Sequence, residues 1–206
     1  MWVKICGVCS VESARVVAEA GADALGLNFV SRSKRKVSED DARAIAAAVR
    51  GRIELIGVVE DCSIERADAL REALKLDRIQ MHTARVALNE SELPEWAYLA
   101  AGISSSADAA KFAVPLQKWV LVDACVAGKS GGTGSTFNWN WVKQLAKKRS
   151  LILAGGLSVS NVAQAIATAL PFGVDVASGV EPAGNPGKKD PELVREFVRL
   201  ARSVQR

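Results

Sequence analysis

The chain has 206 residues, of which 49% are hydrophobic and 24% charged, and its formal net charge is +4. This size and composition fit one domain over 1–206 with a substantial core, and the lack of a long basic run speaks against nucleic-acid binding. No apolar run approaches the roughly 20 residues of a membrane span, and four cysteines are too few for a disulfide framework, so we expect a cytoplasmic protein.

Short apolar runs alternate with helix-like segments along the whole chain. Eight runs have the length and β-branched content of buried strands, at 2–6, 23–30, 53–60, 78–82, 97–103, 119–124, 151–156 and 173–179. Helical patterns lie between or after them at 11–21, 39–50, 64–75, 107–114, 140–148, 160–170 and 191–202. Ser38 has capping-box spacing to Asp41, and Pro191 suits the first turn of the last helix. The segment 89–96 is a poor helix.

This alternation predicts a parallel sheet in an α/β fold. The number of strands favours a closed (β/α)8 TIM barrel, compact beside the roughly 250 residues usual for that fold. An open doubly wound sheet is the alternative, but it normally has fewer strands, and no GxGxxG follows the first run.

Active sites of such barrels lie at the carboxyl ends of the strands, so the residues that close each strand are the candidates. They include Cys6 after the first strand, the basic turn SRSKRK at 31–36 after the second, Gln80 and His82 on the fourth, and Asp123 on the sixth.

Glycine-containing turns follow the last two strands, at Gly155-Gly156 and Ser178-Gly179. They can be ordinary tight turns. However, the turns after strands 7 and 8 are the usual phosphate site of this fold, and glycine leaves backbone N–H groups open to an anion. We therefore expect a phosphorylated ligand.

In a closed ring, strands 7 and 8 lie between strands 6 and 1, so Asp123 and Cys6 flank this phosphate site. A carboxyl and a thiol across a small phosphate ester form an acid–base pair that can move a proton on a sugar phosphate without metal or cofactor. The structural alternatives are a buried thiol for Cys6 and a helix cap for Asp123.

Cys6 and Cys9 also form a CxxC motif. A zinc site would need about two further ligands, and the chain has one histidine, His82, and no second CxxC. A thioredoxin-like dithiol belongs to smaller domains with fewer strands. We therefore expect neither metal nor redox chemistry, and interpret Cys9, Cys62 and Cys125 as ordinary positions.

The motifs, taken together, resemble the phosphoribosylanthranilate isomerase family of tryptophan biosynthesis. The matching segments are KICG at 4–7, GADALGLNF at 21–29, SKRKVS at 33–38, IQMH at 79–82, LVD at 121–123, GGTGSTFNW at 131–139, LAGGLSVSNV at 153–162 and DVASGVEPAGNPGKKD at 175–190. They span nearly the whole chain in order. The family usually has glycine where Thr83 stands and aspartate where Asn138 stands.

The resemblance implies roles for particular residues. Cys6 would be the general base and Asp123 the general acid, while Arg35 would hold the anthranilate part of the substrate. The Gly155-Gly156 and Ser178-Gly179 turns would bind phosphate. His82 and Asp175 would line the pocket, and Lys4, on the same face as Cys6, is a candidate for lowering the thiol pKa.

The implied reaction is an Amadori rearrangement of N-(5-phosphoribosyl)anthranilate to 1-(o-carboxyphenylamino)-1-deoxyribulose 5-phosphate. The implied partner is this phosphoribosyl substrate, and the chain would be a monomer or homodimer. A related phosphosugar isomerase or epimerase, and a phosphate-binding barrel without catalysis, remain alternatives. The pair of Cys6 and Asp123 argues against both, because related histidine-pathway isomerases use two carboxylates and a binding barrel needs neither group.

Overall fold

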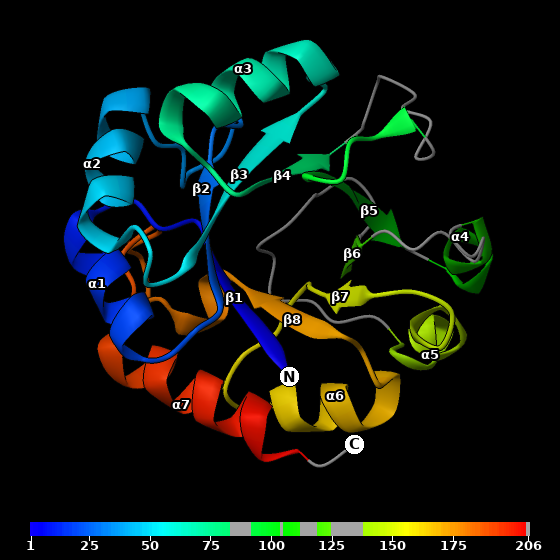
Figure 1. Ribbon diagram of the computed structural model, residues 1–206. Helices are drawn as coiled ribbons and strands as arrows, with labels where there is room; N and C mark the ends of the chain where they lie inside the picture. Colours follow the sequence, from blue (N-terminus) through cyan, green and yellow to red (C-terminus); the bar gives the residue numbers. More distant parts are fainter. Residues whose placement is uncertain (83–91, 104, 112–118, 125–137, 205–206) are drawn as a thin grey trace.

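The computed structural model describes residues 1–82, 92–103, 105–111, 119–124 and 138–204. Eight parallel strands form a closed barrel in chain order, which confirms the predicted fold class (Figure 1). The strands are β1 (Trp2–Cys6), β2 (Ala24–Asn28), β3 (Glu54–Glu60), β4 (Arg78–His82), β5 (Ala97–Ile103), β6 (Val120–Ala124), β7 (Leu151–Leu153) and β8 (Gly173–Val176). The last two are shorter than the apolar runs, because Gly155, Gly156, Ser178 and Gly179 lie beyond the strands.

Helices surround the barrel on the outside (Figure 1). They are α1 (Val11–Glu19), α2 (Glu39–Val49), α3 (Ile64–Leu74), α4 (Ser106–Lys111), α5 (Asn140–Ala146), α6 (Val162–Ala169) and α7 (Pro191–Ser203), with a 3-10 turn η2 (Ser178–Val180). The Ser38 side chain caps α2 by accepting from the Asp41 N–H, and Pro191 opens α7, as predicted. Residues 92–96, described between β4 and β5, contain no α-helix.

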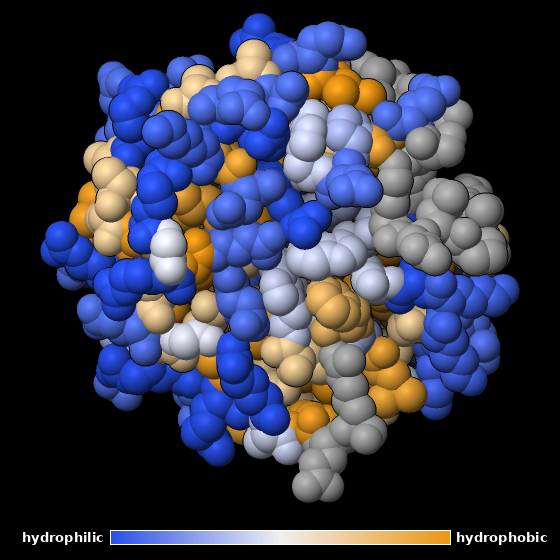
Figure 2. Space-filling model, in the orientation of Figure 1, coloured by the Kyte–Doolittle hydropathy of each residue, from blue (hydrophilic) through white to orange (hydrophobic). Residues whose placement is uncertain are grey.

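Apolar side chains form two layers. The larger cluster lies between strands and helices, and a smaller one fills the barrel with residues Ala24, Ile56, Tyr98, Ala100, Leu121, Ile152 and Ala154. Hydrophilic side chains dominate the surface over the outer helices, whereas paler and hydrophobic ones gather near the centre of the face seen in Figure 2. Because side chains alternate along a strand, the barrel interior also receives Lys4 and Gln80, two polar residues with 0% and 2% exposure.

A glycine on β2 makes room for the interior residues of β1. Gly26 pairs with Cys6 in the sheet register. A Cβ at this position would lie 2.9 Å from the Cys6 Sγ and 3.1 Å from the Lys4 Cε. Both distances are below ordinary van der Waals contact, so Cys6 and Lys4 can occupy these positions only because residue 26 is a glycine.

We expect Gly26→Ala to lower the free energy of unfolding by about 1–3 kcal/mol, the usual cost of overpacking a core. Urea unfolding measures this change. Cys6→Ala removes the nearest atom, so the same substitution should cost less in a Cys6→Ala background. An equal cost in both backgrounds would contradict this packing argument.

Candidate active site

A cavity of about 780 Å³ opens at the carboxyl ends of the strands. This volume is in the range typical for small-molecule sites. Its lining includes these predicted site residues: Cys6, Arg35, His82, Asp123, Gly155, Gly156, Asp175 and Ser178. Gly179 is not among the lining residues. A Cβ on Gly179 would lie 2.0 Å from the Leu157 carbonyl oxygen, so this glycine lets the turns after β7 and β8 pack together.

Beneath the cavity, Lys4 is the centre of a buried polar network. Its Nζ donates to Asp175 Oδ1 at 3.0 Å and to Gln80 Oε1 at 2.9 Å. The Tyr98 hydroxyl donates to the same Gln80 oxygen at 3.1 Å. Burial lowers the pKa of Lys4, but the Asp175 carboxylate together with Cys6 and Tyr98 outweighs burial, and the pKa is raised. Lys4 is therefore a fixed positive charge inside the barrel.

Cys6 lies beside this charge with 9% exposure. Burial raises the pKa of its thiol, and the positive charges of Lys4 and Lys189 partly offset that effect. Lys4 thus acts in the direction expected from the sequence, although burial has the larger effect. The thiol is protonated in the resting site, and the two ammonium groups stabilise the thiolate when it forms.

His82 ends β4 at the edge of the cavity. Its Nε2 lies 2.7 Å from the Gln80 Nε2. Burial and the Lys4 charge lower the pKa of His82 to about 4. The imidazole is therefore neutral near pH 7 and does not attract an anion as a cationic group would.

Arg35 is held in place by an ion pair from the opposite end of the chain. Its Nε and Nη2 donate to the two carboxylate oxygens of Glu181 at 2.8 and 2.6 Å. Glu181 also accepts from Lys189 Nζ at 2.7 Å and from the Gly187 N–H at 2.9 Å. The Arg35 side chain passes over Gly7, where a Cβ would lie 2.4 Å from the Arg35 Cδ. The guanidinium is thus oriented before any ligand arrives.

The turn after β7 exposes backbone in an unusual conformation. Gly155 and Gly156 have φ angles of 89° and 63°, which L-residues with side chains rarely adopt. Asn161, just before α6, donates from Nδ2 to the Gly156 carbonyl and accepts at Oδ1 from the Ser158 N–H, both at 2.9 Å. These two bonds hold the turn in this conformation.

Asp123 lies on β6 opposite Gly102 of β5, and its side chain is half-buried. Strands β7 and β8 separate it from Cys6 around the ring, as the predicted order requires.

The Cys9 thiol has a different environment from Cys6, because its Sγ donates to the Arg35 carbonyl at 3.3 Å. Cys6, Cys9 and Cys62 are free thiols. Among the described residues, no group of three or more histidine, cysteine or acidic side chains could hold a metal ion. Cys125 and Thr83 lie outside the described residues, and Asn138 accepts from the Asn140 N–H at the start of α5.

Sequence reasoning missed Glu181 and Lys189 and assigned no role to Gln80 or Tyr98. One signal was present: Lys4 and Gln80 each stand between two apolar neighbours on a strand, and buried polar side chains require partners. Glu181 and Lys189 lie in the segment GVEPAGNPGKKD, whose pattern gives no indication of which charge faces Arg35.

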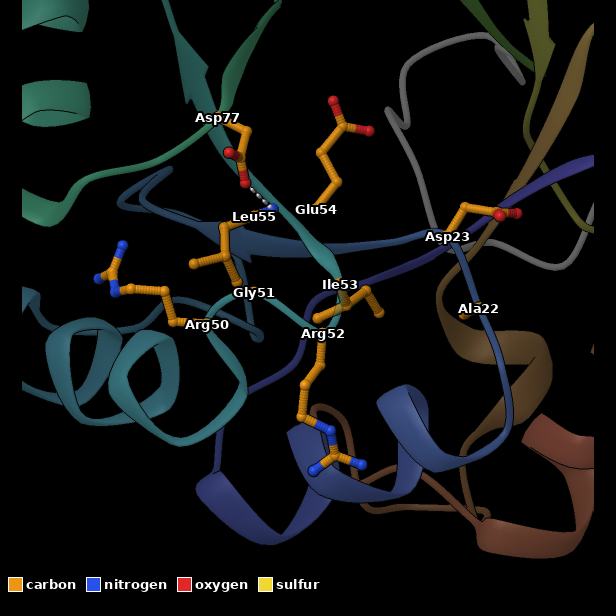
Figure 3. A pocket seen from close by; sticks show the side chains of 9 residues that line it. All are labelled: Ala22, Asp23, Arg50, Gly51, Arg52, Ile53, Glu54, Leu55 and Asp77. Carbon is orange, nitrogen blue, oxygen red and sulfur yellow. Dashed lines mark hydrogen bonds between the residues drawn. The ribbon is translucent and has the colours of Figure 1, made fainter.

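A second cavity, of about 480 Å³, lies near the amino ends of β2, β3 and β4 (Figure 3). Its carboxylates have structural partners. Asp77 Oδ2 accepts from the Leu55 N–H at 2.7 Å, Asp23 Oδ2 from the Val3 N–H at 2.8 Å, and Glu54 from Arg78 at 2.7 Å. These bonds join neighbouring strands at the end of the barrel opposite the usual active-site end.

In the described part of the chain, no helix has the length and apolar character needed to cross a membrane.

Comparison with known proteins gives a consistent result. The family model for N-(5'phosphoribosyl)anthranilate (PRA) isomerase matches residues 3–200. The N-(5'-phosphoribosyl)anthranilate isomerase of Stutzerimonas stutzeri is 41% identical over 204 residues, which are 98% of this chain and 97% of the relative. The corresponding enzyme of Pelobacter propionicus is 35% identical over 203 residues, 98% of this chain and 96% of the relative.

Solved structures agree. The crystal structure of phosphoribosylanthranilate isomerase from Thermotoga maritima has a TM-score of 0.86 and 30% identity, covering 99% of this chain and all of the other. A further isomerase structure, in complex with reduced 1-(o-carboxyphenylamino)-1-deoxyribulose 5-phosphate, has a TM-score of 0.82 at 30% identity, with 99% of this chain and all of the other covered. This chain belongs to the N-(5'-phosphoribosyl)anthranilate isomerase family.

Proposed function

We propose that this chain converts N-(5'-phosphoribosyl)anthranilate to 1-(o-carboxyphenylamino)-1-deoxyribulose 5-phosphate in tryptophan biosynthesis, with Cys6 as general base and Asp123 as general acid. The observation that carries this assignment is the shared cavity: a thiol and a carboxyl line it together with the glycine turn at Gly155-Gly156 and with Ser178. A related isomerase binds a reduced form of the product, which supports the same ligand here.

The reaction begins with two proton transfers on the sugar. The Asp123 carboxyl gives its proton to the furanose ring oxygen, and the C1–O bond breaks to leave a Schiff base between C1 and the anthranilate nitrogen. The Cys6 thiol loses its resting proton to solvent, the resulting thiolate removes the proton from C2, and the electron pair of the C2–H bond forms the enolamine. Tautomerisation of the enolamine gives the ketone product. The charges of Lys4 and Lys189 favour the thiolate that this step requires.

The remaining residues bind the substrate. Arg35 pairs with the anthranilate carboxylate through the guanidinium edge that Glu181 does not use. The turns at Gly155-Gly156 and Ser178-Gly179 hold the phosphate. Asp175 acts through Lys4, which it keeps charged. His82 lies on the wall of the cavity.

The protein would act in the cytoplasm on this small molecule, without nucleic acid or membrane as partner. It would be a monomer or a homodimer, and a solved relative consists of monomers made from the dimeric enzyme of Thermotoga maritima. Turnover of N-(5'-phosphoribosyl)anthranilate, followed by loss of its fluorescence, tests the proposal directly. No turnover, together with retained phosphate binding, would favour a binding barrel instead.

Cys6→Ser and Asp123→Asn should each lower kcat by roughly 10²–10⁴-fold, the usual contribution of a positioned acid or base. A serine hydroxyl is too weakly acidic to supply an anion near pH 7, and an amide cannot deliver a carboxyl proton. The fluorescence assay measures kcat, with Cys9→Ser as a matched control that should stay within a few-fold of the parent. An active Cys6→Ser variant would exclude Cys6 as the base.

Arg35→Ala should raise KM roughly 10- to 100-fold, because a charge-assisted hydrogen bond contributes about 1.5–3 kcal/mol. Arg35→Lys should restore binding only in part, since an ammonium cannot pair with a carboxylate through two parallel bonds. Lys36→Ala, from the same basic turn but outside the cavity lining, is the control. Equal effects of Arg35→Ala and Lys36→Ala would mean that the turn supplies only general positive charge.

Gly156→Val should raise KM for the phosphorylated substrate, because a side chain is strained at this φ of 63° and blocks approach of an anion to the backbone. Inorganic phosphate should compete with substrate in the parent and lose that effect in the variant. Circular dichroism checks that the variant remains folded. Undiminished competition by phosphate would place the anion elsewhere in the cavity.

A further inference from the structure

Gln80 occupies the middle of the polar network with 2% exposure. Its two amide ends face different groups. Oε1 lies 2.9 Å from the Lys4 Nζ and 3.1 Å from the Tyr98 hydroxyl, while Nε2 lies 2.7 Å from the His82 Nε2. One neutral side chain therefore joins the fixed positive charge to the histidine at the cavity edge.

The charge on Lys4 decides which way this amide points. An ammonium group has three donors and no acceptor, so the atom facing it must be the carbonyl oxygen. The reversed amide would place N–H groups against the ammonium at hydrogen-bond distance, with repulsion in a site that excludes water. The Gln80 NH₂ group must therefore face His82, and it can only donate there.

A donor from Gln80 requires an acceptor on His82. The His82 Nε2 must then carry a lone pair and no proton, and in a neutral imidazole the proton resides on the other nitrogen. We propose that Gln80 is a positioning residue that fixes His82 as the neutral Nδ1–H tautomer, so that the ring donates a hydrogen bond to an oxygen of the substrate and does not act as a base through Nε2. The substrate contact in this proposal rests on the proposed function, whereas the tautomer does not.

The charged groups around His82 are compatible with a neutral ring. Lys4 of β1 and Arg32, in the turn after β2, disfavour the imidazolium, whereas Glu60 of β3 favours it. Arg32 and Glu60 form an ion pair with each other, which weakens the influence of Glu60. Because the ring does not compete for the substrate proton through Nε2, abstraction remains with Cys6.

The test is direct because His82 is the only histidine of the chain. In ¹⁵N-labelled full-length protein, two-bond ¹H–¹⁵N correlation spectra report which ring nitrogen bears the proton. We expect the pattern of a bare Nε2 and a protonated Nδ1, unchanged from pH 7.5 to about pH 5.5. A proton on Nε2 in the parent protein would overturn the proposal, and this measurement needs no substitution.

Gln80→Glu tests the cause. A carboxylate accepts from both Lys4 and His82, so the variant should place a proton on Nε2, as the other tautomer or as an imidazolium with a raised pKa. Tyr98→Phe is the matched control, since it removes one partner of Gln80 but leaves the bond to Lys4; its His82 pattern should equal that of the parent. If the His82 Nε2 stays bare in folded Gln80→Glu, Gln80 does not set the tautomer.

The ligand contact is tested separately with reduced 1-(o-carboxyphenylamino)-1-deoxyribulose 5-phosphate. On binding, the Nδ1 and Nδ1–H resonances should shift while Nε2 stays bare. Binding that leaves these resonances unmoved would overturn the substrate contact. Failure of the analogue to bind, with the Nδ1–H tautomer present, would contradict the proposed function and leave the role of Gln80 intact.

Discussion

The ammonium group of Lys4 is the charge on which the interior of the barrel depends. It is fully buried, and such a charge is stable only when it is paired and hydrogen-bonded. Asp175 of β8 and Gln80 of β4 meet this need from two different strands. Removing one partner of a buried pair typically costs about 3–5 kcal/mol, so β1, β4 and β8 are energetically coupled through Lys4.

The same charge determines the electrostatics of the cavity. It opposes the effect of burial on the Cys6 thiol and lowers the pKa of His82. A single cation therefore favours an anion on one neighbour and a neutral state on the other. Cys6 and His82 could each accept a proton, but Lys4 favours the thiolate of Cys6 and disfavours the protonated form of His82. A site with a single base requires such a difference between the two groups.

Glycine contributes as much to the site as the charged residues. Gly26 gives space to Cys6 and Lys4, Gly7 to the Arg35 chain, and Gly179 to the backbone at Leu157. In each case another part of the chain occupies the place of a side chain. Three close approaches around the cavity therefore depend on glycine.

The order of strands and helices was predictable because hydrophobic periodicity is local, although β2, β7 and β8 end before their apolar runs do. Cys6 and Asp123 could be selected because the ring order places their strands on either side of β7 and β8. The pairing of Arg35 with Glu181, and of Gln80 with Lys4, depends on the stagger of a closed barrel. No local pattern contains that stagger, so these contacts required the three-dimensional structure.

The position of Asp175 near the carboxyl end of the sequence has a consequence for how the protein folds. A growing chain contains Lys4 almost from the start, but the Asp175 carboxylate that pairs with it is synthesised only with the last strand, β8. Until β8 arrives, the ammonium is better solvated by water than by the barrel, so the first strands cannot close over it at low cost. Ring closure and dehydration of this lysine should therefore be one late event, and the binding surface for substrate forms in that same step.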